Sequence, residues 1–351
     1  MPHRGLISAL SRIGVSGSLL RWFTSYFSDR RQQVVVDSST SASSLVRSGV
    51  PQGSILGPLL FSIYIDPITS LSLSSTSKIL LYADDILLYK PILCEEDEIA
   101  LQSDINIIIN WINDASLKLN ASKTKLLLVS RQKLPPTLSL FVNQEQIQQV
   151  DSVVYLGVTL THNLSFYTHI NNTCKQAKSQ LGLLYRIFGQ ASTSALNHLY
   201  KALVLPTLDY CSAIWDPYFK CQSDLLEHVQ KLASKIVSKR WNISSYEHLL
   251  SHLKWEPLAL RRKKQKVLLC HRILSGHSII SPSVFTPHPS PQLRHCHNHP
   301  LFCPFAHTRS YLSSFFISVI PLWNSTHPNI MAYFSQPSFK YHLKLNSEPF
   351  L

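Results

Sequence analysis

Two adjacent carboxylates, Asp84 and Asp85, offer the most specific chemistry in this sequence. They interrupt an apolar stretch that runs from Lys78 to Lys90, with aliphatic residues on both sides of the pair. Apolar runs bounded by charge are typical of buried strands, so we expect a hairpin with both strands in a core and both acids exposed at its tip. Carboxylates held in this way suit divalent metal ions, and sites with two metal ions carry out phosphoryl transfer. The alternative is that the pair only shapes a turn, because Asp is common in turns.

A glycine-rich segment at residues 49–58 is the second candidate site. It has the sequence Gly-Val-Pro-Gln-Gly-Ser-Ile-Leu-Gly-Pro and leads into an apolar run at residues 59–65. Glycine permits close approach of the backbone to a ligand, so we expect a glycine-lined loop that feeds a helix. A simple connection between a strand and a helix is the alternative, although it needs fewer glycines and no glutamine.

Hydrophobic periodicity predicts the elements that must position these residues. Helices are expected at residues 5–27 (interrupted near Gly14 and Gly17), 95–117, 166–188, 192–204, 222–240, 246–253, 257–275 and 310–323. Strands are expected at residues 31–36, in the hairpin around Asp84, within 117–129 and as a pair with a glycine bend at 153–160. The acidic residues at 95–98 fall in the first turn of a helix, where the helix dipole favours them, so we interpret them as helix-start charge.

The net charge of +13 is distributed unevenly along the chain. Residues 1–160 contain 13 Lys and Arg against 13 Asp and Glu, whereas residues 161–280 contain 16 against 6 and residues 281–351 contain 4 against 1. A basic helical region beside a neutral region that carries the acids indicates a polyanionic partner such as nucleic acid. The alternative is that Lys and Arg only solvate exposed helix faces.

Length and composition limit the remaining possibilities. A chain of 351 residues with 45% hydrophobic residues is typical of a globular protein with two domains and room for a third. No apolar stretch is long enough for a membrane helix, and the N-terminus lacks the apolar core of a signal peptide, so we expect no membrane partner and no secretion. Seven dispersed cysteines do not suit a disulfide framework, which indicates an intracellular location in the nucleus or cytoplasm.

Four sequence blocks, in this order, resemble the reverse transcriptases of non-LTR retrotransposons of the Jockey-like and LINE type. The blocks are residues 49–65 (similar to motif B), Tyr-Ala-Asp-Asp at 82–85 (motif C), Asn-Ala-Ser-Lys-Thr at 120–124 (motif D) and Tyr-Leu-Gly-Val at 155–158 (motif E). Residues 20–30 resemble the helix before motif B, and residues 309–316 with Leu-Trp-Asn at 322–324 resemble the end of these open reading frames. The resemblance therefore extends over nearly the whole chain.

The resemblance implies an α+β fold with the organisation of a right-hand polymerase. A partial palm would cover residues 1–161, a basic helical thumb residues 162–275 and a helical C-terminal extension residues 276–351. The implied activity is that of an RNA-directed DNA polymerase, with an RNA template, a DNA primer and dNTP as partners. The thumb would contact the template–primer backbone in a sequence-independent and salt-dependent way.

The resemblance also implies roles for single residues. Asp84 and Asp85 would be the catalytic metal ligands for Mg²⁺, of which two ions activate the primer 3′ hydroxyl and stabilise the leaving pyrophosphate. The other residues with an implied role are Gln52 and Gly53 beside the incoming nucleotide and template, Lys123 near the pyrophosphate, and Tyr155, Leu156 and Gly157 at the primer end.

The sequence departs from the family pattern at its start. The family has a further metal-binding Asp in motif A, just before the stretch that matches residues 2–6, and this sequence begins at Met1. Asp29, Asp37 and Asp66 do not fall in a suitable strand, so we expect an incomplete Mg²⁺ site in a chain truncated at its N-terminus, with weak or no activity alone. The alternatives are a non-catalytic nucleic-acid-binding remnant and a group II intron maturase, and the resemblance at residues 322–324 argues against the maturase.

Three further patterns have less specific interpretations. Cys296, His299, Cys303 and His307 loosely resemble a zinc-ligand set, but they lie closer together than the two ligand pairs of most structural sites. The tryptophans at 215, 241 and 255 are expected in the helix core more often than in base stacking. The basic run at 261–266 is compatible with phosphate contacts, a nuclear signal or a solvated helix face.

Overall fold

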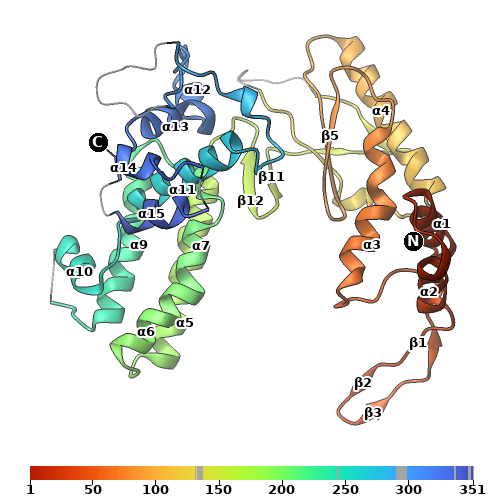
Figure 1. Ribbon diagram of the computed structural model, residues 1–351, viewed down its shortest axis with the longest axis horizontal. Coiled ribbons are helices and arrows are strands. Elements are labelled where there is room, and N and C mark those ends of the chain that lie inside the picture. The colour runs from red at the N-terminus through yellow and green to blue at the C-terminus, as the bar shows by residue number, and fades with distance from the viewer. Residues whose placement is uncertain are drawn as a thin grey trace. The chain divides into compact units, whose positions relative to one another are not determined.

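The structure, a computed structural model, describes the chain except residues 131, 133–136, 243–244, 290–298, 336, 347–348 and 351. The described residues form a mixture of helices and short strands, which confirms the expected α+β class (Figure 1). The chain divides into two compact units, Met1–Asp151 and Ser152–Leu351. Each unit contains hydrophobic cores of its own.

Three helices form the N-terminal part of the first unit. They are α1 (His3–Arg12), α2 (Gly17–Phe27) and α3 (Leu56–Ile65). The predicted break between the first two helices is confirmed, because Gly14 and Gly17 have positive φ angles of 95° and 61°. The buried core that the three helices share includes Leu6, Leu10, Phe27 and Leu60.

The segment between α2 and α3 forms two small antiparallel ladders. Their strands are β1 (Arg31–Gln32) paired with β4 (Ser44–Leu45), and β2 (Val35–Val36) paired with β3 (Ser39–Thr40). The single strand predicted at 31–36 is therefore wrong in its extent. Asp37 and Ser38 both have positive φ angles and turn the chain back, so β2 forms a tight hairpin of its own.

The hairpin around the paired acids consists of β5 (Lys78–Tyr82) and β6 (Asp85–Tyr89), and it packs against α4 (Glu95–Asp114). One face of the hairpin joins a core with α4 through Ile79, Leu81, Ile86 and Leu88. On the opposite face, Leu80, Tyr82 and Tyr89 are 45%, 63% and 45% exposed. The expectation that both strands lie in a core is therefore wrong for one face, because successive side chains of a strand point to opposite faces and α4 covers one of them.

Short strands and turns complete the first unit. They are η1 (Asp66–Ser70), η2 (Ala121–Lys123), β7 (Lys125–Leu126), β8 (Phe141–Val142), β9 (Glu145–Gln146) and β10 (Gln148–Gln149). Strand β7 pairs parallel with β10, and β8 pairs antiparallel with β9. The strand predicted within 117–129 is only two residues long, and Leu126 and Leu128 pack against a core that includes Leu101 and Ile109 of α4.

The second unit begins with a hairpin and continues as helices. Strands β11 (Ser152–Tyr155) and β12 (Val158–Thr161) form the predicted pair with a glycine bend. The helical elements are α5 (Tyr167–Phe188), α6 (Thr193–Leu199), η3 (Tyr200–Val204), α7 (Leu205–Asp209), α8 (Ser212–Trp215), α9 (Lys220–Ser238), α10 (Tyr246–Leu253), α11 (Leu258–Leu274), η4 (Pro282–Val284), α12 (Arg309–Ser313), α13 (Phe315–Asn324), α14 (Pro328–Met331) and α15 (Phe339–Leu345). The helices predicted for the regions of α5, α9, α10 and α11 are confirmed.

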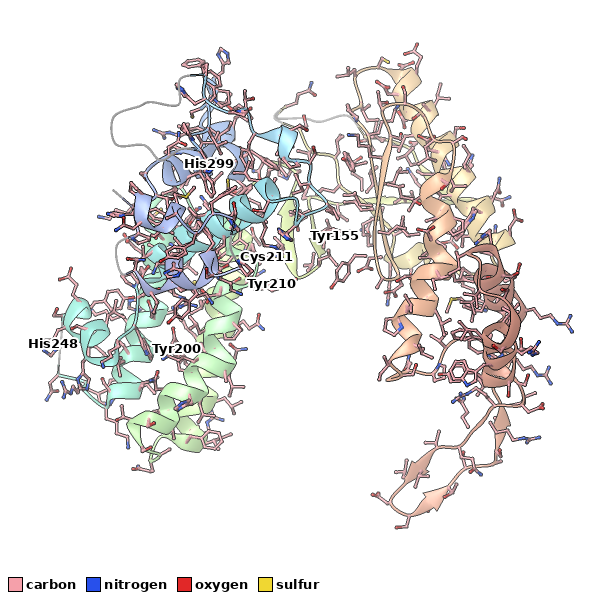
Figure 2. All side chains as sticks on the ribbon, in the orientation of Figure 1. Tyr155, Tyr200, Tyr210, Cys211, His248 and His299 are labelled. Carbon is pink, nitrogen blue, oxygen red and sulfur yellow. The ribbon has the colours of Figure 1, made fainter. Side chains whose placement is uncertain are left out.

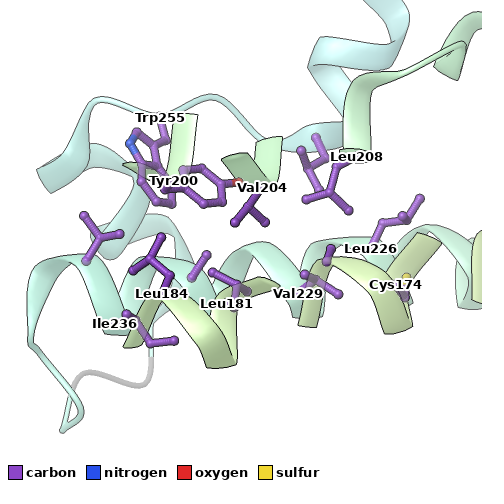
Figure 3. Close-up of a cluster of buried hydrophobic side chains, with 14 of the residues drawn as sticks. Cys174, Leu181, Leu184, Tyr200, Val204, Leu208, Leu226, Val229, Ile236 and Trp255 are labelled. Carbon is purple, nitrogen blue, oxygen red and sulfur yellow. The ribbon is translucent and has the colours of Figure 1, made fainter. Parts of the chain in front are cut away.

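The larger core of the second unit lies among α5, α9 and the segment 193–209 (Figure 3). Tyr200 and Trp255 are both buried there and stack with their ring centroids 4.2 Å apart. The helix predicted at 192–204 contains a π-helical turn, η3, and then continues as α7. Pro206 lies in the first turn of α7, and its missing N–H accounts for the interruption of the α-helical hydrogen bonds.

A second core of this unit joins α11 to α13 and α15. The His271 ring of α11 lies flat against the Phe339 ring of α15, with the centroids 4.0 Å apart, and its Nε2 is hydrogen bonded to the Phe334 carbonyl oxygen at 2.6 Å. The helix predicted at 310–323 is divided into α12 and α13. Among the helices of the described residues, none is both long and apolar enough to span a membrane.

Candidate functional site

Asp84 and Asp85 lie at the tip of the β5–β6 hairpin. Tyr82 pairs with Asp85, so Ala83 and Asp84 form a two-residue loop. Both carboxylates are exposed, which confirms their predicted place, and neither forms a hydrogen bond or ion pair within the described residues. The described residues contain no group of three or more His, Cys, Asp and Glu side chains placed to hold a metal ion. The tip therefore presents two carboxylates that have no partner within the described residues and can act as oxygen ligands.

The backbone of this turn is strained. Ala83 has a φ of 51°, in the left-handed region, which costs a residue with a Cβ atom about 1–3 kcal/mol. Such a conformation persists only where the surrounding structure imposes it. The paired strands on both sides of Ala83 impose it here and fix the backbone of the two acids.

A buried carboxylate, Asp104 of α4, anchors the loop before the hairpin. It accepts hydrogen bonds from the Ser74 N–H at 2.9 Å and from the Ser74 hydroxyl at 2.6 Å. Burial opposes ionisation of Asp104, but hydrogen bonds from Ser74 and Ser77 and the charge of Lys90 lower its pKa below the ordinary value. The role of Asp104 is not predicted from the sequence pattern, although a charged residue on the buried side of an amphipathic helix is a signal that could identify it.

Lys90 completes the anchor after the hairpin. Its Nζ donates hydrogen bonds to the Ser74 and Thr76 hydroxyls and forms an ion pair with Asp97 of α4 at 3.4 Å. Helix α4 therefore holds the chain on both sides of the hairpin, before β5 through Asp104 and after β6 through Asp97. This double attachment makes the hairpin a firm support for the acids at its tip.

Gln52 lines a basic pocket of about 440 Å³ in the first unit. Arg30, Arg31 and His3 line the same pocket. The His3 Nε2 is hydrogen bonded to the Gly49 carbonyl oxygen at 3.1 Å, which joins α1 to the glycine-rich loop. The sequence pattern does not predict these three basic residues, because they meet Gln52 only when the chain folds.

Gly53 and Lys123 occupy turns of the first unit. Gly53 has a φ of 77°, so glycine suits this position in the loop. Ser54 beside it is joined to the first turn of α3, since its hydroxyl accepts a hydrogen bond from the Gly57 N–H at 3.0 Å. Lys123 ends η2 with an exposed side chain that has no partner in the described part of the chain. Neither Lys123 nor the paired aspartates line the Gln52 pocket.

The turn between β11 and β12 carries the predicted primer-end residues Tyr155, Leu156 and Gly157, and it belongs to the second unit (Figure 2). Leu156 and Gly157 have φ angles of 45° and 78°. The Tyr210 hydroxyl donates a hydrogen bond to the Leu156 carbonyl oxygen at 2.9 Å, across 54 positions of sequence. A Cβ atom at Gly157 would lie 3.3 Å from the Tyr210 ring, so this ring supports the turn at close range. Tyr210 is a residue of this site that the sequence pattern does not predict.

The basic run at 261–266 lies in α11 and is largely internal. Within it, Arg262, Lys264 and Lys266 are only 2%, 4% and 5% exposed. Cations buried to this degree neither solvate a helix face nor reach an import receptor or a phosphate backbone. All three interpretations of the run are therefore wrong for these residues.

Carboxylates outside α11 neutralise the buried run. Asp216 forms ion pairs with the Arg262 Nε at 2.8 Å and with the Lys266 Nζ at 2.7 Å. The other pairs are Arg261 with Asp209 and Lys264 with Glu256. The run therefore attaches α11 to three other segments of the second unit.

The remaining sequence patterns can be located in part. Trp215 and Trp255 are buried, which confirms their expected place in the core, whereas Trp241 is 48% exposed. Of the zinc-like set, Cys296 lies outside the described residues, and its described members are His299, Cys303 and His307. The His299 ring stacks on Phe334. The six cysteines in the described part of the chain are free.

Comparisons with known proteins identify a domain in the first part of the chain. Residues 1–160 match the family described as reverse transcriptase (RNA-dependent DNA polymerase). The probable RNA-directed DNA polymerase from transposon BS of Drosophila melanogaster is 30% identical over 246 residues, which are 67% of this chain and 27% of that protein. The probable RNA-directed DNA polymerase from transposon X-element of the same organism is 27% identical over 219 residues, which are 60% of this chain and 24% of that protein. The RNA-directed DNA polymerase from mobile element jockey of Drosophila funebris is 25% identical over 250 residues, which are 68% of this chain and 27% of that protein.

Residues 1–160 carry a reverse transcriptase domain, and the relatives of the chain are RNA-directed DNA polymerases of non-LTR retrotransposons. The resemblance to the reverse transcriptases of non-LTR retrotransposons is therefore confirmed, and the matched residues include the four sequence blocks that carry it. The chain spans about a quarter of the length of these curated relatives.

Proposed function

We propose that this chain forms the palm and thumb of a reverse transcriptase that synthesises DNA on an RNA template. The hairpin tip is the observation that supports this proposal most. Asp84 and Asp85 are exposed, unpaired within the described residues and fixed through Asp104, and they lie in the segment that matches the family. In this assignment the partial palm is residues 1–161, the thumb is residues 162–275 and the C-terminal extension is residues 276–351.

The two tip carboxylates suit Mg²⁺ chemically. Mg²⁺ takes oxygen ligands, often one or two carboxylates together with substrate phosphates and water. Asp84 and Asp85 provide such oxygens, and no Lys or Arg among the described residues forms an ion pair with them. When bound, the ions supply charge stabilisation for the attacking hydroxyl and the leaving pyrophosphate. The contribution of the chain itself is to hold both carboxylates in place on the anchored hairpin.

The pocket around Gln52 is the proposed site for phosphates of the nucleotide or template. Guanidinium groups bind phosphate oxygens through paired hydrogen bonds. Arg30 is partly engaged, because its Nη1 donates to the Tyr26 carbonyl oxygen at 3.3 Å and its guanidinium lies over the Tyr26 ring. Arg31 has no such contact within the described residues, so it is the better candidate for a phosphate. Exposed Lys123 would add a point charge for the pyrophosphate.

The turn with Tyr155, Leu156 and Gly157 is proposed to hold the primer end, supported by Tyr210. Residues 161–280 carry 16 Lys and Arg against 6 Asp and Glu, and this excess of positive charge supports contact with the template–primer backbone. Such contacts weaken as salt concentration rises, because binding releases counterions from the nucleic acid. RNA template, DNA primer and dNTP are the proposed partners.

Primer extension tests the proposal directly. The chain and the variant Asp84→Asn/Asp85→Asn are incubated with an RNA template, a DNA primer, dNTP and Mg²⁺. The matched control, Glu95→Gln/Glu145→Gln, removes two exposed charges elsewhere in the first unit. Extension that only the aspartate variant loses would support the assigned roles and contradict the expectation of weak or absent activity. Extension that the aspartate variant retains would refute those roles.

Template–primer binding separates the proposal from its alternative, a nucleic-acid-binding remnant without chemistry. Fluorescence anisotropy of a labelled template–primer measures this binding for the chain and for both variants. Binding without extension in all three proteins would favour the alternative. Absence of binding at low salt would contradict both functions, because each requires contact with the phosphate backbone.

A further inference from the structure

A second basic pocket, of about 340 Å³, lies in the second unit and contains none of the residues proposed for the metal, nucleotide or primer-end sites. Five cationic residues line this pocket, which we call the lysine pocket. They are Lys201, Lys254, Arg261, Lys264 and Lys344. They belong to the π-helical turn, the end of α10, α11 and α15. The fold therefore brings cations from four separate elements to one concave surface.

Only part of this positive charge is neutralised within the protein. The two cations from α11 have carboxylate partners in the ion pairs described above. Lys201, Lys254 and Lys344 are exposed and have no ion pair within the described residues. Like charges at one pocket repel each other, and such clusters are typical of surfaces that concentrate an anionic ligand.

Backbone contacts fix two of these three lysines at the pocket. The Lys264 Nζ donates hydrogen bonds to the carbonyl oxygens of Lys344 at 3.3 Å and Asn346 at 2.6 Å, which holds the end of α15. The Lys254 N–H donates a hydrogen bond to the Ser251 carbonyl oxygen at 3.1 Å, and Lys254 follows α10 with a φ of 52°, where glycine or asparagine is usual. A lysine there carries a backbone cost that a glycine would avoid.

The lining of the pocket favours a compact ligand over a nucleic-acid strand. Its volume falls within the range of small-molecule pockets, roughly 300–1,000 Å³. Trp255 is buried and stacked on Tyr200, so it offers no open ring for a nucleobase, whereas proteins that bind single strands present such rings. Lysine ammonium groups bind phosphate oxygens as point charges without the planar geometry that a guanidinium needs.

We propose that the lysine pocket binds a compact polyphosphate anion, the chemistry shared by inorganic tripolyphosphate and the triphosphate group of a nucleotide. The ion pairs of α11 form the inner surface, and Lys201, Lys254 and Lys344 contact the phosphate oxygens. This proposal does not rest on the polymerase function, because the pocket uses neither Asp84 nor Asp85 and none of the residues proposed for the nucleotide or the primer end.

Isothermal titration calorimetry of the full chain with sodium tripolyphosphate, without Mg²⁺, tests the proposal. The pocket variant is Lys201→Ala/Lys344→Ala, and the control Lys175→Ala/Lys220→Ala removes the same charge from exposed positions of α5 and α9. We expect saturable binding that is at least about tenfold weaker in the pocket variant and changed by less than about twofold in the control. Absence of saturable binding, or equal weakening in both variants, would overturn the proposal.

A single substitution guards against loss of folding in the double variant. Lys254→Asn removes one pocket charge and suits the left-handed backbone at this position. Thermal melting followed by circular dichroism shows whether each variant is folded. We expect folded Lys254→Asn to bind tripolyphosphate about threefold or more weakly, and unchanged affinity would count against the proposal.

Two further titrations identify the source of the ligand. Equal affinity for tripolyphosphate and dATP would show that phosphate groups suffice, and tighter binding of dATP would identify a nucleotide, so both results support the proposal. Displacement of tripolyphosphate by an RNA–DNA duplex would assign the lysines to a nucleic-acid surface and overturn it. The Asp84→Asn/Asp85→Asn variant should bind tripolyphosphate normally, so failure of the polymerase function would leave this result unchanged.

Discussion

Neutralisation of Asp216 is the change for which the structure predicts the largest loss of stability. Its carboxylate lies 2.8 Å from the Arg262 Nε and 2.7 Å from the Lys266 Nζ, and both cationic side chains are buried. In Asp216→Asn, the two cations would face an uncharged amide of the same size. Removal of one partner from a buried ion pair costs about 3–5 kcal/mol, because the other charge stays buried without compensation.

Two hydroxyl groups limit this loss. The Arg262 Nη2 donates a hydrogen bond to the Ser223 Oγ at 2.8 Å, and the Lys266 Nζ donates to the Ser318 Oγ at 3.0 Å. Each cation therefore keeps one partner, so we expect a single loss of about 3–5 kcal/mol rather than twice that value. Domains are typically stable by about 5–15 kcal/mol, so such a loss would be a large part of the total.

Urea denaturation followed by tryptophan fluorescence measures the effect, because Trp215 and Trp323 are fully buried in the second unit. The control Asp224→Asn removes an exposed charge from α9 and should change the free energy of unfolding by less than about 0.5 kcal/mol. If Asp216→Asn also stayed within about 0.5 kcal/mol of the unmodified chain, the claim that this charge network stabilises the unit would be refuted.

Three further predictions concern the anchors and the buried histidines. Asp104→Asn should destabilise the first unit by about 1–3 kcal/mol and speed amide hydrogen exchange in β5 and β6, and unchanged exchange by mass spectrometry would exclude the anchoring role. Tyr210→Phe removes the hydrogen bond to Leu156, so we expect the free energy of unfolding in urea to fall by about 0.5–1.5 kcal/mol. We also expect weaker template–primer binding by anisotropy. Unchanged values in both measurements would count against a supporting role of Tyr210. Burial lowers the pKa of His169 and of His271 below the ordinary value of 6.5. As the pH falls, the unfolded chain therefore binds protons at these histidines before the folded chain does. The stability that depends on them is full above pH 6.5 and falls below it. A melting temperature that stayed constant down to about pH 5 would contradict this reasoning.

Local patterns in the sequence are sufficient for the hairpin tip and for most long helices. Asp84 and Asp85 separate two short apolar runs. The turn is therefore encoded within thirteen positions of the chain, from Lys78 to Lys90. The start signal of helix α10 is Ser245, whose side chain accepts a hydrogen bond from the His248 N–H. This signal and the apolar spacing of the helix lie within one short segment. Such information needs no knowledge of distant partners.

Partners that are distant in sequence are not predictable in this way. The basic run of α11 has the composition of a solvated face, and only the folded chain brings Asp209 and Asp216 to it. Tyr210 reaches the Leu156 turn for the same reason, from the end of another helix. A single sequence gives no measure of these contacts, because the energies of long-range pairs do not appear in local periodicity.

The burial of each hairpin face is not predictable from the sequence for a different reason. Leu80, Tyr82 and Tyr89 belong to apolar runs, so the composition predicts them in a core. Burial depends on what packs against each face, and α4 covers the face that carries Ile79 and Leu81. The number of layers around a hairpin is a property of the whole fold, so an apolar run by itself does not determine it.

Metal binding at the hairpin tip tests the central claim most directly. Mn²⁺ is a suitable spectroscopic substitute for Mg²⁺, because carboxylate oxygens bind both ions. Electron paramagnetic resonance counts bound Mn²⁺ in the presence of dNTP for the unmodified chain, for Asp84→Asn/Asp85→Asn and for the control Glu95→Gln/Glu145→Gln. We predict that Mn²⁺ binding is lost in the aspartate variant and retained in the control. Equal Mn²⁺ binding by all three proteins would contradict the assignment of Asp84 and Asp85 as the metal ligands.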